Sequence, residues 1–309
     1  CVVLALYSLP GPGCERLVLG GQVPADIADE MRVAHMGGDF SFPLRYGYSL
    51  VGRVVDGPAS HLNRLIHCLH PHMAWCSVPV EEAALLPDAL PPRRATLAAS
   101  METALSIAWD ANVQPGDRVL LIGFGLIGSL VARILAAIPG VDLDILEQSS
   151  TRCELARQLG FVASPGVDPR ALESQNCCDR YDTVINATAS GEALYLAFRL
   201  LRREGRAIHA GWSGTATSEL NLGTEFHSRR LRLICSQTSH IPQNRSAGWN
   251  HRRRRKLALR LLAVDAAYDY HLGPDVPFAH APSRYIDLIH SEQHLAGTLR
   301  YTRAQPDGA

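Results

Sequence analysis

In VLLIGFGLIG, residues 119–128, an apolar run leads into a turn that is rich in glycine. The run VLLI has the length of a buried parallel strand. Gly123, Gly125 and Gly128 follow it in G-x-G-x-x-G spacing and lead into a helical pattern at 129–138. A strand before the glycines and a helix after them are the context that this motif requires.

Each glycine has a separate task in a dinucleotide-binding turn. Gly123 permits the tight turn, Gly125 lets the backbone approach a pyrophosphate, and Gly128 lets the helix lie close to the strand. The free N–H groups and the positive dipole end of the helix, where Leu126 and Ile127 stand, favour phosphate. We therefore expect a dinucleotide here, and a plain strand–helix turn is the less favoured alternative.

An acidic residue stands where such a site holds the adenosine ribose. Glu147 ends a second apolar strand, LDIL, about 20 residues beyond the glycines. A carboxylate there repels a 2′-phosphate and so favours NAD over NADP as the cofactor, although Arg152 could soften that preference. The alternative for Glu147 is a solvated carboxylate at a strand end. Asp144 lies inside the same strand, where an unpaired carboxylate would be costly.

Apolar runs and helical patterns alternate through the middle of the chain. The runs lie at 119–122, 143–146, 181–188, 205–212 and 231–237. This alternation predicts the α/β fold class, with right-handed βαβ units on the parallel sheet of a doubly wound Rossmann domain. Ligands of such sheets bind beyond the carboxyl ends of the strands, so Ala187, Thr188 and Gly211 are further cofactor-binding candidates.

The composition is that of an ordinary soluble globular protein of 309 residues, a length that favours two domains. Lys plus Arg equals Asp plus Glu at 30 each, so no net field favours nucleic acid or a membrane surface. No apolar run approaches the length of a membrane span. Eight cysteines without regular spacing favour a reducing cytoplasm and disfavour a structural zinc lobe. Cys1 begins what reads as a strand, so we expect a missing N-terminal piece.

The first hundred residues are rich in Gly, Pro and short β-like runs, and they contain PLRYGYSLVGRVV at 43–55. This frame, P43-x-x-x-G47-x-x-x-x-G52-x-V54, occurs together with the glycine turn and with E147-x-x-x-x-R152-x-x-x-A156-x-x-L159-G160. On these three motifs the chain resembles the medium-chain dehydrogenase/reductase superfamily, the zinc-type alcohol dehydrogenase-like proteins, along nearly its whole length.

The resemblance implies three segments and an active site in the cleft between two domains. We expect a GroES-like catalytic domain at 1–109, a Rossmann NAD-binding domain at 110–239, and a C-terminal segment at 240–309 that completes the catalytic domain. It also implies a small-molecule substrate, and a homodimer, since dimers are common in the superfamily. The first fifty residues look closest to short branches of it.

The zinc ligands of the superfamily are mostly absent. Gly11 stands near the position of the first ligand, a cysteine, and Tyr48 stands at the position of the ligand histidine. Only Glu102 matches an acidic ligand of polyol-type members, and one oxygen cannot hold a zinc tetrahedron. Cys68, His70 and His72 together with Glu102 offer an alternative zinc site, which Pro71 disfavours. We therefore expect no metal, with zinc as an unlikely cofactor.

A nicotinamide moves hydride without a metal, so the chemistry of the superfamily is expected to remain. His70 matches a position that lines the substrate pocket of the superfamily, and its imidazole could give or take the proton. Tyr48 could do so from the vacated zinc position, and Glu102 is the third candidate catalytic residue. The sequence thus predicts a zinc-independent NAD(H) oxidoreductase for an alcohol or carbonyl substrate. The alternatives are a quinone- or enoyl-type C=C reductase and a non-catalytic dinucleotide-binding protein.

Overall fold

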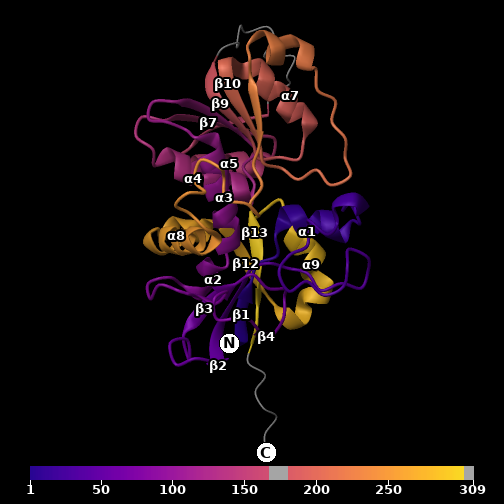
Figure 1. Ribbon diagram of the computed structural model, residues 1–309, viewed down its shortest axis with the longest axis vertical. Coiled ribbons are helices and arrows are strands. Elements are labelled where there is room, and N and C mark those ends of the chain that lie inside the picture. The colour runs from indigo at the N-terminus through magenta and orange to yellow at the C-terminus, as the bar shows by residue number, and fades with distance from the viewer. Residues whose placement is uncertain (167–179, 303–309) are drawn as a thin grey trace, which may run out of the picture. The chain divides into compact units, whose positions relative to one another are not determined.

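The computed structural model describes residues 1–166 and 180–302. They form two compact units, a first unit of residues 1–99 with 251–302 and a second unit of residues 100–166 with 180–250 (Figure 1). No helix in the described part of the chain is long and apolar enough to cross a membrane.

The first unit is built on a mixed sheet to which both the N-terminal and the C-terminal segments contribute strands. The strand order is β12-β13-β1-β2-β3-β5, with β4 also paired to β1. Its strands are β1 (Val2–Ser8), β2 (Leu50–Asp56), β3 (Leu65–Cys68), β4 (Trp75–Ser77), β5 (Ala84–Leu85), β12 (Leu272–Pro277) and β13 (Ala296–Arg300). Strands β12 and β13 pair in parallel, and the other pairs that these strands form are antiparallel. Its helices and helical turns are α1 (Pro12–Leu19), η1 (Ala25–Ile27), α2 (Pro92–Ala95), α8 (His251–Val264), η3 (Ala266–His271), η4 (Phe278–His280) and α9 (Ala281–His290).

The C-terminal segment contributes to the core and to the ion pairs of this unit. Leu299 of β13 is buried in one apolar cluster with Val3 of β1 and Ile66 of β3. The buried guanidinium of Arg94 donates to both carboxylate oxygens of Asp269, at 2.8 and 2.5 Å. Such two-pronged pairs fix the orientation of both partners. The segment after residue 250 is therefore an integral part of the first unit.

The second unit is a six-stranded parallel sheet in the order β11-β10-β9-β6-β7-β8. Its strands are β6 (Arg118–Ile122), β7 (Asp142–Glu147), β8 (Val162–Pro165), β9 (Tyr181–Asn186), β10 (Leu201–His209) and β11 (Arg232–Cys235). Its helices are α4 (Leu126–Ala136), α5 (Ser150–Gln158), α7 (Gly191–Leu200) and the short η2 (Leu222–Phe226), preceded by α3 (Ala98–Ala111), which starts in the first unit. Helix α7 lies on the opposite side of the sheet from α4 and α5 (Figure 1).

This strand order is that of a doubly wound sheet, in which the chain starts in the middle and extends first to one edge and then to the other. The reversal lies between β6 and β9, whose paired residues include Ile122 and Asn186. The predicted doubly wound sheet is confirmed. Helix α4 begins at Leu126, three positions before the predicted helix, because its N-cap is Gly125 of the turn itself.

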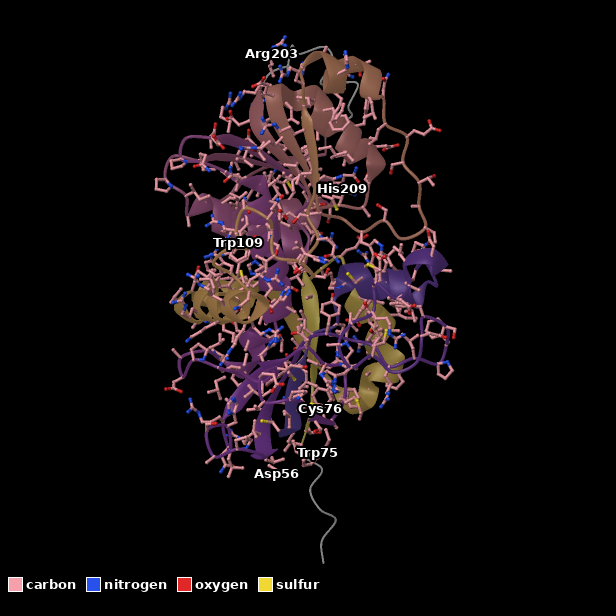
Figure 2. All side chains as sticks on the ribbon, viewed as in Figure 1. Asp56, Trp75, Cys76, Trp109, Arg203 and His209 are labelled. Carbon is pink, nitrogen blue, oxygen red and sulfur yellow. The ribbon has the colours of Figure 1, made fainter. Side chains whose placement is uncertain are left out.

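The units divide at 99/100 and 250/251, whereas the sequence suggested boundaries at 109/110 and 239/240. Most of α3 and the stretch up to residue 250 pack together within the second unit. The rings of Trp109 and Trp249 lie 4.8 Å apart, and Asn244 donates to the carbonyl of Trp109 at 3.0 Å. Figure 2 labels Trp109. These contacts place both flanks of the predicted Rossmann segment in that unit.

Two local features complete the description of the units. Residues 12–19 form helix α1, in which Pro12 at the first helical position has the backbone angle that a helix needs there. Asp144 is not an unpaired charge, because the hydroxyl of Tyr181 on β9 donates to its carboxylate at 2.7 Å.

Candidate functional site

The glycine turn of the second unit has the shape of a pyrophosphate cradle. Gly123 has a φ of +97°, a left-handed conformation that favours glycine. A Cβ added to Gly128 would lie 2.1 Å from the carbonyl oxygen of Gly123, so helix α4 packs directly on the end of β6. A Cβ added to Gly125 would meet only Arg152, at 4.0 Å. The space above Gly125 is thus open toward the N-terminus of α4, as the phosphates of a dinucleotide require.

Glu147 ties the turn to the next helix. Its side chain is buried, and one carboxylate oxygen accepts the backbone N–H of Phe124 at 2.6 Å. The other oxygen accepts the backbone N–H of Ser149 at 2.8 Å. Each carboxylate oxygen can accept a second hydrogen bond, so the hydroxyls of a ribose can still be held. The residues therefore fit an adenosine ribose at the end of β7. Glu147 is not a solvated carboxylate, because it is buried and accepts two backbone hydrogen bonds.

The remaining predicted cofactor residues gather at the same edge of the sheet. The backbone N–H and the hydroxyl of Thr188 both donate to Asn186 Oδ1, at 3.0 and 2.6 Å. A Cβ on Gly123 would lie 2.6 Å from the Thr188 methyl group, and one on Gly211 would lie 1.9 Å from the Thr188 carbonyl oxygen. The structure thus brings Gly123, Thr188 and Gly211 together, with Ala187 between Asn186 and Thr188. Their contact with a cofactor stays a prediction.

In the first unit, Tyr48 fills the space beside Gly11. A Cβ added to Gly11 would lie 1.6 Å from the Tyr48 hydroxyl oxygen. The hydroxyl also forms a hydrogen bond with the Cys14 thiol, and burial raises the pKa of that thiol to about 11. Burial, with Cys14 and Glu15 nearby, raises the pKa of Tyr48 well above its ordinary value. The phenol is therefore protonated at neutral pH and can donate a hydrogen bond.

A buried carboxylate that the sequence did not point to, Glu15, lies next to Gly11. Glu15 accepts the backbone N–H of Gly11 at 2.6 Å and the hydroxyl of Tyr285. Its second oxygen lies 3.2 Å from His72 Nε2, and His72 Nδ1 lies 2.8 Å from the Ser8 hydroxyl. An acidic residue in the first turn after Pro12 is a helix-start signal that could have marked Glu15. Its partner Tyr285 could not have been found from local spacing.

Replacing Glu15 by Gln should lower the free energy of unfolding by about 2 kcal/mol, because the new amide N–H₂ would face donors that now share a carboxylate. Urea denaturation of the purified variant measures the loss. Glu30→Ala, at an exposed position of the same unit, is the matched control and should lie close to wild type. A Glu15→Gln protein as stable as wild type would show that this network contributes little.

His70 and Tyr48 lie just beyond the paired ends of β3 and β2. Leu50 pairs with Cys68 between these strands, and the His72 N–H donates to the Tyr46 carbonyl at 3.2 Å. The His70 ring stacks on the ring of His35, with the centroids 5.0 Å apart. His70 Nδ1 lies 3.0 Å from the Pro71 carbonyl, which can only accept, so Nδ1 carries the proton. Burial lowers the pKa of His70, so the ring is neutral at neutral pH and its Nε2 can accept a hydrogen bond.

Glu102, the third candidate catalytic residue, and Cys68, one of the alternative metal ligands, are both buried. Glu102 lies in α3 of the second unit, and Cys68 lies in β3 of the first. Ser49, next to Tyr48, is buried and donates to the Thr96 carbonyl at 2.6 Å. Within residues 1–166 and 180–302, no group of three or more His, Cys, Asp or Glu side chains is arranged to hold a metal ion.

The chain is similar to sugar and sugar-acid dehydrogenases in sequence. It is 28% identical over 200 residues to D-guloside 3-dehydrogenase of Escherichia coli K12, covering 62% of this chain and 57% of that protein. It is 29% identical over 238 residues to L-galactonate-5-dehydrogenase of the same organism, covering 74% of this chain and 64% of that protein. The chain therefore spans less than two thirds of the length of either relative. Comparison with models of known families finds none that matches.

Solved structures share the fold across 97% of this chain. Alcohol dehydrogenase TADH from Thermus sp. ATN1 superposes with a TM-score of 0.75 at 17% identity, over 91% of that chain. A putative zinc-binding dehydrogenase from Sinorhizobium meliloti 1021, bound to NADP, gives 0.74 at 17% identity, also over 91% of its chain. The likeness confirms the predicted fold class, a GroES-like β domain plus a Rossmann domain. The solved structures therefore show the fold, and the sequence comparison shows similarity to two proteins named as dehydrogenases.

Proposed function

We propose that the chain is a zinc-independent oxidoreductase that transfers a hydride between NAD(H) and an alcohol or carbonyl substrate. The observation that carries the proposal is the glycine turn closed by Glu147, with open space above Gly125 and buried contacts at Gly128. Two relatives named as dehydrogenases support hydride transfer as the reaction.

The arrangement around Gly11 supports a reaction without zinc. The Tyr48 hydroxyl takes the space into which a ligand side chain at residue 11 would extend. A bound nicotinamide supplies or accepts the hydride. His70 Nε2 holds the proton that an alcohol loses on oxidation, and the Tyr48 hydroxyl donates a hydrogen bond to the substrate oxygen. Metal analysis of the purified protein tests this arrangement, and one tightly held zinc per chain would overturn it.

The carboxylate of Glu147 supports NAD as the preferred cofactor, because it repels the 2′-phosphate of NADP. Solved structures of the same fold include a complex with NADP and an alcohol dehydrogenase complex with NADH, so the fold accepts both. NADH should bind this chain about tenfold more tightly than NADPH, and Glu147→Gln should narrow that ratio by removing the charge. Fluorescence titration with both cofactors measures the ratio. Tighter binding of NADPH to the wild type would contradict the assignment.

The names of the two relatives favour a polyhydroxylated substrate, because one acts on a guloside and the other on a galactonate. A screen of sugars, sugar acids and polyols that follows the absorbance of the reduced cofactor tests this substrate class. Activated alkenes belong in the same screen, since their reduction would indicate a C=C reductase. Cofactor binding without turnover of any compound, unchanged in His70→Ala and Tyr48→Phe, would instead indicate a non-catalytic protein.

A further inference from the structure

The second half of the parallel sheet has a polar carboxyl edge that the dinucleotide turn does not use. A doubly wound sheet consists of two mononucleotide-binding halves that meet where the strand order reverses. Here β6, β7 and β8 form the half with the glycine turn and Glu147, and β9, β10 and β11 form the other. If the proposed function holds, the adenosine lies on the first half. The nicotinamide riboside must then lie on the second.

His209 ends β10 on this second half, and Figure 2 labels it there. In the parallel register it is paired with Asn186, the last residue of β9, and with Cys235, the last residue of β11. The Asn186 amide nitrogen lies 3.4 Å from His209 Nδ1. Because Asn186 itself is fully buried, the imidazole is fixed against a rigid neighbour.

The hydrogen bonds of Asn186 determine which nitrogen of His209 carries the proton. Asn186 Oδ1 accepts two bonds from Thr188, and Asn186 Nδ2 donates to the Ser190 carbonyl at 3.0 Å. This pattern identifies the amide nitrogen, whose second hydrogen is available to His209 Nδ1. Burial lowers the pKa of His209, so the ring is neutral at neutral pH. With Nδ1 as the acceptor, Nε2 carries the hydrogen.

The Nε2–H of His209 has no acceptor among residues 1–166 and 180–302, and the side chain is only partly buried. A donor with a fixed orientation is thus presented at the carboxyl edge of the half that binds the second mononucleotide. We propose that the Nε2–H of His209 donates a hydrogen bond to an oxygen of the nicotinamide riboside of the bound coenzyme. Asn186 is the residue that positions it.

Calorimetric titration with NADH and with ADP tests this inference, because ADP has the adenosine and the pyrophosphate but lacks the nicotinamide riboside. His209→Ala should weaken NADH about tenfold, the value of one hydrogen bond, and leave the affinity for ADP unchanged within about twofold. His209→Gln, which keeps an N–H donor, should recover part of the NADH affinity. His227→Ala, at an exposed histidine of the same unit, is the matched control and should bind both ligands as wild type does.

Two results would overturn the assignment of His209 and leave the dinucleotide site in place. In one, His209→Ala binds NADH as tightly as the wild type does. In the other, the substitution weakens the binding of NADH and of ADP by the same factor. A wild type that binds neither ligand would overturn the proposed function and this inference with it. If His209→Ala does not fold, histidine nitrogen resonances of the wild type decide the matter. The Nε2 resonance of His209 should shift with NADH and not with ADP, and an unchanged resonance counts against the inference.

Discussion

Gly125→Ala is expected to weaken NADH binding about 100-fold or more while the protein stays folded. The backbone of Gly125 is in an extended conformation with a φ of −76°, which alanine also adopts. Among the described residues, and apart from the chain neighbours of Gly125, the nearest atom to the added methyl group would be Nη1 of Arg152, at 4.0 Å. It would lie instead where a pyrophosphate must approach the backbone. The free energy of unfolding should fall by about 1 kcal/mol or less, the difference between Gly and Ala at a helix N-cap.

Gly128→Ala is the matched variant for this measurement, because its methyl group would meet the protein itself. The new Cβ would lie 2.1 Å from the carbonyl oxygen of Gly123, a backbone atom that cannot rotate away. Helix α4 would have to move off the strand, at a cost of about 3 kcal/mol or more. Urea denaturation and calorimetry on both variants separate binding from folding. NADH binding by Gly125→Ala within a few fold of wild type would show that the turn does not hold the pyrophosphate.

Gly11→Ala should destabilise the first unit by about 3 kcal/mol or more, because its Cβ would overlap the Tyr48 hydroxyl. Tyr48 is held by its neighbours, among them the Cys14 thiol and the ring of Tyr46 at 6.2 Å, so the phenol has little room to turn aside. Removing the Tyr48 ring as well should relieve the overlap. The double variant Gly11→Ala/Tyr48→Ala is therefore expected to be more stable than the sum of the single losses by about 2 kcal/mol.

Gly13→Ala provides the control for Gly11→Ala, because a Cβ at Gly13 would have nothing within 4 Å. The double-mutant cycle compares the free energies of unfolding of four proteins: the wild type, Gly11→Ala, Tyr48→Ala and the double variant. Thermal or urea unfolding measures each of them. Strict additivity of the two single changes would mean that Tyr48 does not occupy the space beside Gly11. The proposal that a phenol stands where a zinc ligand would otherwise extend would then lose its physical basis.

The second unit could be predicted from the sequence because its signals are local. The glycine spacing, the acid at the end of β7 and the strand–helix alternation each lie within a few residues or one βαβ unit. The residues Gly123, Gly125, Gly128 and Glu147 were selected in this way, and their contact with a cofactor stays a prediction.

The polar contacts of the first unit could not be predicted from the sequence, because they join segments that are distant along the chain. Glu15 meets Tyr285, 270 positions away, and Asp275 meets Arg93, 182 positions away. Asp144 in the second unit is a smaller case, paired with Tyr181 across 37 positions. The spacing of residues within one segment predicts whether that segment is a helix or a strand. It does not predict which distant residue will be its hydrogen-bond partner.

The pairing of β1 with β13 has a consequence for the order of events on the ribosome. Strand β1 needs Leu299 and Arg300 as partners, so its sheet cannot close until nearly the whole of this chain has been made. Residues 100–250 are continuous in sequence and contain all the strands of their own sheet. Since domains fold as units while synthesis proceeds, we expect the parallel sheet to form first. Until β13 is made, Tyr7 and Ser8 of β1 present an open edge, the kind of edge at which a chain can aggregate.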